Sequence, residues 1–389
     1  MKNAFQKFGQ WFQKAVFSNE QRPFDWLLFF STLPIVGAGL ITMNSFQSGN
    51  NYFFEKQLIW IAVAIIIFFI LSLIDFRFLR RTDVLVSLFA LGCISLIVLL
   101  LLNNVVRGSR SWFSFGGFSF QPSDPTKLLL ILILAKYFSR RHIEIANIRH
   151  ILVSGFYAFV LFFLVFLQPD FGSSVIIFLV WFGMVLLSGI SKKHLIAVFL
   201  IGLLSFSVLW FYVFKDYQKE RILSFLHPLT DVQDSGYNAY QSTIAVGSGK
   251  IFGKGVGYGT QSRLKFLPEY QTDFVFAAFA EEWGYFGVLL LFLLFMIIIL
   301  QILRNAFHGD TNFEILFGLG LTIFFLSHFT INVGMNIGLL PVTGIPLPFM
   351  SYGGSHLLTE YAGLGILMGM RRYSRPIHKD SIKNEFIGV

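Results

Sequence analysis

The residues best suited to chemistry lie in the stretch from Phe266 to Gly284, F-L-P-E-Y-Q-T-D-F-V-F-A-A-F-A-E-E-W-G. It closes a polar segment, opens an apolar run, and places four carboxylates at that boundary: Glu269, Asp273, Glu281 and Glu282. Charges next to hydrocarbon cost free energy and are seldom kept there without a use. We interpret Asp273 as the working group, on the outer face of a membrane.

These acids also have purely structural explanations. Thr272 and Asp273 precede the apolar run, so Asp273 could cap the N-terminus of a helix. Glu281 and Glu282 could cap a kink at Gly284, or be neutral and hydrogen-bonded. The pattern alone leaves both interpretations open.

The composition decides the class of protein that must position these acids. The chain is 55% hydrophobic and only 13% charged. Several apolar runs approach the roughly 20 residues that cross a bilayer. The single cysteine excludes an internal disulfide, and no Cys/His cluster has zinc-ligand spacing. In such a protein the net charge of +9 marks cytoplasmic loops and not a nucleic-acid partner.

The sequence therefore predicts an all-α integral membrane protein with about ten transmembrane helices. The expected spans are residues 25–43, 58–75, 83–102, 126–139, 151–168, 172–189, 195–214, 274–303, 313–333 and 353–370. Together they form one domain over residues 25–372, with a large extracytoplasmic loop at 215–272 between the seventh and eighth spans.

Basic clusters on alternate connections place both termini in the cytoplasm. Residues 1–24 have aromatic residues at helical spacing with lysines between them, which indicates an amphipathic helix on the inner leaflet, although a disordered basic leader is the alternative. Residues 373–389 form a polar cytoplasmic tail.

Three further segments concentrate polar residues on the predicted outer face. Val106 to Lys127 combines Arg110 with Asp124 and Lys127; the two last could act in the site, or could be an acid and a base paired at a helix start. Asp170, in Q-P-D-F-G, is expected to be a helix cap. The segment from Gly338 to Ser355 contains three prolines, which favours a re-entrant segment lining a cavity before the last span.

The large loop contains the glycine-rich basic run from Tyr240 to Lys265. Its amides could approach phosphate oxygens, with Lys254 and Arg263 among the cations beside them. It matches no nucleotide-binding pattern, so we expect an anionic, lipid-linked substrate.

Five runs in order resemble one known family: FQPSDPTKL, LQPDFGSSVI, YQSTIAVGSGKIFGKGVGYGTQSRLKFLPE, TDFVFAAFAEEWG and GLLPVTGIPLPFMSYGGS. They are similar to those of the SEDS proteins (shape, elongation, division and sporulation), which are ten-span peptidoglycan glycosyltransferases. INVGMNIGLLPVTGIPLPF resembles the RodA-type branch more than the FtsW-type branch. Four positions depart from the usual pattern: Gln271 for histidine, Asp124 for glutamate, Ser111 for arginine and His356 for serine.

The resemblance implies polymerisation of lipid II for cell-wall elongation and cell shape. It implies Asp273 as the catalytic residue, acting as the general base for an attacking sugar hydroxyl. Because pyrophosphate leaves without a protonating acid, cations suffice on the leaving-group side. The candidate substrate-binding residues are Lys127, Asp124, Arg110, Arg263, Glu269, Ser351 and Gly353.

No protein metal site is expected, although a divalent cation, Mg²⁺ or Mn²⁺, could share the task of neutralising pyrophosphate. The expected partners are a class B penicillin-binding protein (a transpeptidase), lipid II and membrane lipids, with no nucleic acid. The expected location is the bacterial cytoplasmic membrane, with the active site outside. A lipid-precursor flippase, a non-catalytic scaffold and an FtsW-type division paralogue stay open as alternatives.

Overall fold

The computed structural model describes residues 24–45, 52–102, 111–115, 118–139, 148–189, 191–213, 219, 223, 225, 235–264, 266–267 and 269–373. The predicted amphipathic segment 1–24 and tail 373–389 lie almost entirely outside these residues. The same is true of Arg110 and of most of residues 215–234.

Each of the ten predicted spans coincides with a helix. These helices are α2 (Trp26–Ser45), α3 (Tyr52–Ser72), α4 (Thr82–Leu102), α5 (Ser123–Ser139), α6 (Ile148–Leu167), α7 (Phe171–Leu187), α8 (Lys192–Val208), α12 (Val275–Phe307), α13 (Asn312–Asn336) and α14 (Gly354–Arg372). Among the described residues, six helices are long and apolar enough to cross a membrane: α2, α3, α4, α6, α12 and α13. α7 and part of α8 are shorter apolar helices.

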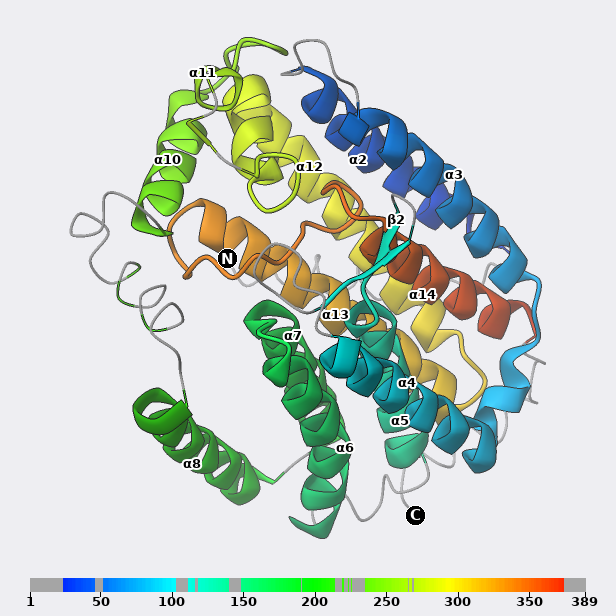
Figure 1. Ribbon diagram of the computed structural model, residues 1–389. Helices are drawn as coiled ribbons and strands as arrows, with labels where there is room; N and C mark the ends of the chain where they lie inside the picture. Colours follow the sequence, from blue (N-terminus) through cyan, green and yellow to red (C-terminus); the bar gives the residue numbers. More distant parts are fainter. Residues whose placement is uncertain are drawn as a thin grey trace, which may run out of the picture.

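α5 is buried along most of its length, under α4, α6, α7, α13 and α14. α13 packs against both α5 and α7, and α14 packs against α3 and α5. α12 lies between α2 and α13, whereas α6 pairs with α7. Figure 1 shows α8 standing apart from this bundle, beyond α6 and α7. A short, mainly apolar helix such as the middle of α5 is stable only when other helices cover it.

Short elements lie between these helices. The strands β1 (Phe113–Phe115) and β2 (Phe118–Phe120) form an antiparallel pair just before α5. A 3₁₀ helix, η1 (Phe76–Arg80), joins α3 to α4, and a π-helical turn, η2 (Leu209–Val213), extends α8.

The large loop predicted at 215–272 is partly helical. It contains α10 (Ser235–Ser248) and the single turn α11 (Thr260–Arg263). Figure 1 shows both beside the N-terminal part of α12. α10 packs against α12 and α13, burying Ser242 and Ala245 completely.

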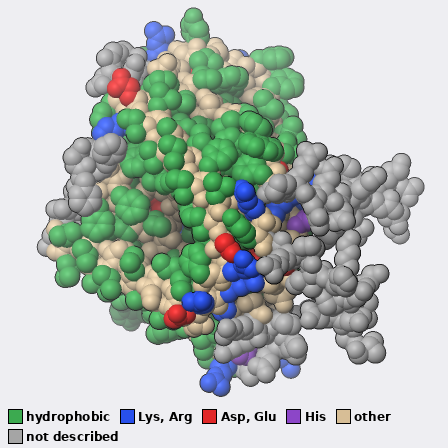
Figure 2. Space-filling model, turned by 90° about the vertical axis from the view of Figure 1, so that its right-hand side faces the viewer, with side chains coloured by type: hydrophobic (Ala, Val, Ile, Leu, Met, Phe, Trp, Pro, Cys, Tyr) green, Lys and Arg blue, Asp and Glu red, His purple; other side chains and the backbone are tan. Residues whose placement is uncertain are grey.

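The outer surface carries many large apolar side chains. Leu101 is 76% exposed on α4 and Phe199 is 68% exposed on α8. On the face in Figure 2, hydrophobic side chains cover most of the surface, and charged side chains gather mainly at the lower right and near the upper left edge. Such a surface suits contact with lipid rather than with water.

Candidate active site

Asp273 lies in the turn that leads into α12, and its backbone is fixed from α13. The Asp273 carbonyl oxygen accepts hydrogen bonds from the side-chain amides of Asn332 and Asn336, each at 3.0 Å. Asn336 also accepts a hydrogen bond from the Ala277 amide at 3.1 Å. Helix α12 begins at Val275 with Phe274 as its cap residue, so the interpretation of Asp273 as the N-cap is wrong.

The Asp273 carboxylate faces the connection between α13 and α14, residues 337–353. At Gly344, an added Cβ would lie 3.4 Å from Asp273 Oδ2. Gly344 has φ +73°, a conformation that favours glycine. A bare backbone therefore leaves room beside the carboxylate.

The 337–353 connection is non-helical and partly buried, in agreement with the three prolines in it. Ser351 ties it to the Asp273 turn: the Ser351 hydroxyl donates to the Thr272 carbonyl at 2.6 Å and accepts from the Leu347 amide at 2.8 Å. The Tyr352 amide donates to the Gln271 carbonyl at 2.8 Å. Ser351 thus positions the turn that carries Asp273.

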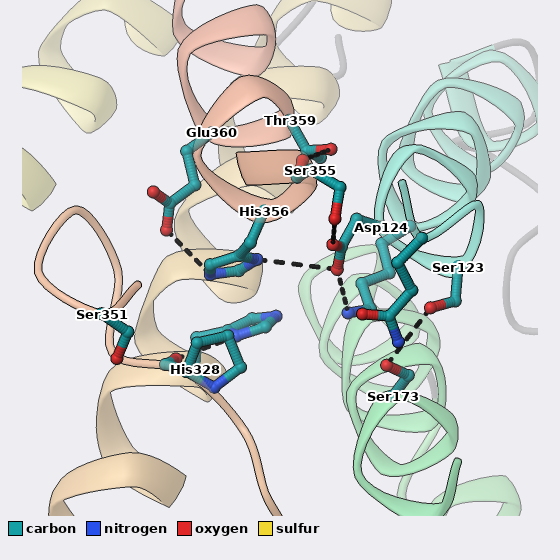
Figure 3. Close-up of polar contacts among 12 residues, drawn as sticks. Ser123, Asp124, Ser173, His328, Ser351, Ser355, His356, Thr359 and Glu360 are labelled. Atoms are coloured by element: carbon teal, nitrogen blue, oxygen red, sulfur yellow. Dashed lines mark hydrogen bonds and ion pairs between the residues drawn. The ribbon is translucent and has the colours of Figure 1, made fainter. Parts of the chain in front are cut away.

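A buried ionic cluster lies between α5 and α14 (Figure 3). Lys127 Nζ is 2.9 Å from Asp124 Oδ1, so the predicted pair at the helix start is present. The Ser355 hydroxyl donates to Asp124 Oδ2 at 2.8 Å. His356 lies between Asp124 and Glu360, with Nδ1 3.6 Å from Asp124 Oδ1 and Nε2 2.9 Å from Glu360 Oε1.

Asp170 caps α7, as predicted. Its Oδ1 accepts the Ser173 amide at 3.0 Å. Its Oδ2 accepts the Gln121 side-chain amide at 2.7 Å and faces the Ser123 hydroxyl at 3.4 Å. One carboxylate therefore joins the starts of α5 and α7, which fixes the end of α5 that carries Asp124.

The glycine-rich loop is bound to a kink in α12. The kink is at Gly284, with φ 64° and ψ −165°, as the sequence had suggested. Lys254 Nζ is 2.7 Å from Glu281 Oε1, and the Gly257 amide donates to Glu282 Oε1 at 2.7 Å. The amides of Lys254 and Gly255 donate to the carbonyls of Glu281 and Glu282. The expectation that these amides approach phosphate oxygens is therefore wrong for this part of the loop.

The remaining predicted residues are more peripheral. Arg263 is exposed on α11, and Glu269 is exposed, with its carboxylate accepting from the Thr272 hydroxyl at 3.0 Å. The Gly353 amide faces Gln57 Oε1 at 3.4 Å at the start of α14. Burial raises the pKa of the nearby Tyr270 hydroxyl. Among the residues that the structure describes, no group of three or more His, Cys, Asp and Glu side chains is arranged to hold a metal ion.

Sequence reasoning missed four residues that shape the site: Asn332, Asn336, His328 and Glu360. A usable signal existed for Glu360, because an acid within an apolar span is a functional candidate by default. It also stands four residues after His356, on the same face of a helix. The two asparagines gave no comparable signal, since their partners are backbone carbonyls distant in sequence.

Comparison with known proteins identifies the family. A family profile described as "Cell cycle protein", FtsW/RodA/SpoVE, matches residues 23–376. Stage V sporulation protein E of Bacillus subtilis (strain 168) is 36% identical over 365 residues, covering 90% of this chain and 98% of the relative. Peptidoglycan glycosyltransferase MrdB of Escherichia coli (strain K12) is 37% identical over 289 residues, covering 74% and 78%.

Solved structures share the fold. A chain from a peptidoglycan synthase complex, described as coordinating polymerization and crosslinking, superposes with a TM-score of 0.77 at 28% identity, covering 90% of this chain and 99% of that one. The rod shape determining protein RodA of Thermus thermophilus gives a TM-score of 0.68 at 26% identity, covering 90% and 98%. The chain belongs to the FtsW/RodA/SpoVE family, the SEDS proteins, and is a multi-pass membrane protein.

Proposed function

We propose that the chain is a peptidoglycan glycosyltransferase that polymerises lipid II, with Asp273 as the general base. Relatives named peptidoglycan glycosyltransferase support the activity. The observation that carries the residue assignment is the placement of Asp273: its backbone is clamped by two buried amides, and its carboxylate faces the bare backbone of Gly344.

In the proposed reaction, the 4-hydroxyl of one sugar attacks the anomeric carbon of a muramyl pyrophosphate. The Asp273 carboxylate accepts the hydroxyl proton as the new glycosidic bond forms with inversion and the lipid pyrophosphate leaves. Such a base contributes typically ~10²–10⁴-fold to the rate. Cationic side chains stabilise the negative charge that develops on the leaving pyrophosphate.

Arg110 and Arg263 remain proposals for that cationic role. Lys127 is 2% exposed and its ammonium is bound to Asp124 of the same helix, so its first task is to neutralise the carboxylate that accepts the Ser355 hydroxyl of α14. We retain a direct contact of Lys127 with the substrate as a prediction. Glu269 and Gly353 are retained in the same way, as residues at the edge of the site.

We further infer that all ten helices that coincide with the predicted spans cross the membrane, with both termini in the cytoplasm and Asp273 outside. Single cysteines in a Cys93→Ser background test this arrangement. A cysteine at Phe252, which is 81% exposed, should react with an impermeant thiol reagent added outside intact cells. A cysteine at Lys193 should react only after the membrane is opened. Labelling of both from outside would refute the proposed sidedness.

We propose a class B penicillin-binding protein as the partner and cell-wall elongation as the role. The structural similarity to a chain of a peptidoglycan synthase complex supports the partner. Depletion of the protein should then cause rod-shaped cells to round up, whereas a division role would give filaments.

The decisive experiment is polymerisation of labelled lipid II by purified protein. Wild type is compared with Asp273→Asn and with Glu55→Gln, an exposed acid on α3, each with and without a transpeptidase that has no polymerase activity of its own. Glycan from wild type and Glu55→Gln, but none from a folded Asp273→Asn, is the expected result. Equal product from all three would remove the general-base assignment. Product from none would favour a flippase, which a lipid translocation assay would detect.

A further inference from the structure

The buried cluster between α5 and α14 has an unequal number of acids and obligate bases. Asp124 and Glu360 are its two carboxylates, and Lys127, paired with Asp124, is the one lysine or arginine in ionic contact with either of them among the described residues. All three side chains are nearly inaccessible, at 3%, 0% and 2% exposure. A buried charge without a partner is strongly unfavourable, so the second acid is ionised only if a second cation lies beside it.

His356 occupies the position where that cation is needed. Its Nδ1 lies 3.6 Å from Asp124 Oδ1 and its Nε2 lies 2.9 Å from Glu360 Oε1 (Figure 3). A neutral imidazole donates from only one ring nitrogen, whereas an imidazolium donates from both. Neither ring nitrogen makes an aligned hydrogen bond, but each lies at ion-pair distance from a carboxylate, so the charged form balances the cluster.

The other side chain facing His356 is His328 of α13. The two rings lie with their centroids 4.5 Å apart. His328 Nδ1 faces the Pro346 carbonyl at 3.4 Å, and its Nε2 is buried without a hydrogen-bond partner. Two adjacent positive rings repel each other, so His328 is the neutral member of the pair.

The bridge is connected to Asp273 through the 337–353 connection. Glu360 Oε2 accepts the Phe349 amide at 3.0 Å. Phe349 has φ +62°, which is unfavourable for a residue with a side chain and persists only when its surroundings impose it. Two residues on, the Ser351 hydroxyl donates to the carbonyl of Thr272, the neighbour of Asp273.

We propose that His356 is an imidazolium that bridges Asp124 and Glu360, and that this bridge is a positioning element for the turn that carries Asp273. The second half of the proposal rests on the proposed function. In this proposal His356 contacts no reacting atom. It holds Glu360, and Glu360 holds the turn at Phe349. That turn in turn positions Ser351, which is bonded to the residue before Asp273.

The charge requirement is tested with three variants: His356→Gln, Glu360→Gln and the two together. His356→Gln leaves two carboxylates against one ammonium, and kcat should fall about 10- to 100-fold with KM changed by less than about threefold. The double variant removes one acid and one base together, while the glutamine that replaces Glu360 still offers an oxygen to the Phe349 amide. The double variant should recover most of the lost kcat. If His356 acted only by filling space, the second substitution would not restore activity.

The pH dependence gives a second readout. Removing the proton from His356 leaves Asp124 and Glu360 against Lys127 alone, so kcat of wild type should fall as the pH is raised through that titration. The double variant, which lacks both the imidazole and the second carboxylate, should not show this loss. Identical pH profiles for wild type and the double variant would overturn the positioning role.

A readout independent of activity tests the bridge itself. In protein labelled with ¹⁵N-histidine and reconstituted in lipid vesicles, an imidazolium with both nitrogens protonated should be present at neutral pH and absent from His356→Gln. Only neutral signals for His356 would overturn the bridge. If wild type makes no glycan, the proposed function fails while the NMR result still decides the charge state. An imidazolium whose loss leaves kcat unchanged would overturn the positioning role alone.

Discussion

Replacing Asn332 by leucine tests the clamp that holds Asp273. The Asn332 side-chain amide is fully buried and donates to two carbonyls, that of Asp273 at 3.0 Å and that of Ile345 at 2.8 Å. It therefore joins the turn that carries Asp273 to the connection that faces it. Leucine has a similar volume but no donor, so both carbonyls lose this hydrogen bond.

The expected loss of stability follows from those carbonyls. A buried acceptor deprived of its donor costs about 1–3 kcal/mol, and the Asp273 carbonyl keeps its second donor, Asn336. The effect on catalysis should be larger in proportion. A shift of a reacting group by about 1 Å can cost ~10²-fold in rate, equivalent to ~2.7 kcal/mol. We expect kcat of Asn332→Leu to fall by about that factor with KM little changed.

The assay is lipid II polymerisation normalised to folded protein, with a thermal melt of each sample. Asn305→Leu is the matched control: Asn305 is also a buried asparagine, bonded to Asp25 and Arg371 at the opposite end of α12. It should lower the melting temperature without lowering kcat of the folded fraction. Equal losses of kcat in both variants, or an unchanged kcat in Asn332→Leu, would refute the clamp.

Two glycine substitutions separate backbone strain from effects on the site. Gly344→Ala places a Cβ 3.4 Å from Asp273 Oδ2, whereas the Cβ of Gly338→Ala, at a similar φ of +75°, meets only Thr243. Both variants should lose about 1–2 kcal/mol of stability in thermal melts. Only Gly344→Ala should also lose kcat, by about 10-fold. A comparable kcat loss in Gly338→Ala would contradict this assignment. Gly284→Ala would bring a Cβ within 2.2 Å of the Gly253 nitrogen, at a backbone conformation open essentially to glycine alone, and should prevent stable folding. Gly247→Ala on α10, with open space around it, is the control and should be neutral or stabilising by about 0.5–1 kcal/mol. Equal melting temperatures for Gly284→Ala and Gly247→Ala would refute the claim that the kink requires glycine.

The sequence predicted the helices well because the signal is strong and local. Apolar runs of near-spanning length leave few alternatives, so all ten predicted ranges coincide with helices. Helix ends with polar residues were harder to predict. Glu55 and Lys56 interrupt the apolar pattern of α3, so the predicted start was residue 58, whereas the helix begins at Tyr52. α10 was missed because its own composition is polar and rich in small residues, and its stability comes from packing on α12 and α13.

The candidate site was predictable only in part, for a different reason. Three site residues, Asp273, Asp124 and Lys127, lie in sequence motifs that resemble those of the SEDS family, so the sequence alone identifies them. The contacts that hold them depend on which helices become neighbours: the pairing of α5 with α14 brings His356 to Asp124, and the pairing of α12 with α13 brings Asn332 to Asp273. No periodicity within one segment contains this information.

The two anchors of α12 explain why one carboxylate can be held still at the end of such a long helix. Before its first turn, Asn332 and Asn336 fix the Asp273 backbone to α13. Further along, near the Gly284 kink, Glu281 is bound to Lys254 of the glycine-rich loop. A helix fixed at only one of these points could rotate or slide relative to its neighbours. With both points fixed, we expect the short segment between them to keep its orientation and Asp273 to stay beside Gly344.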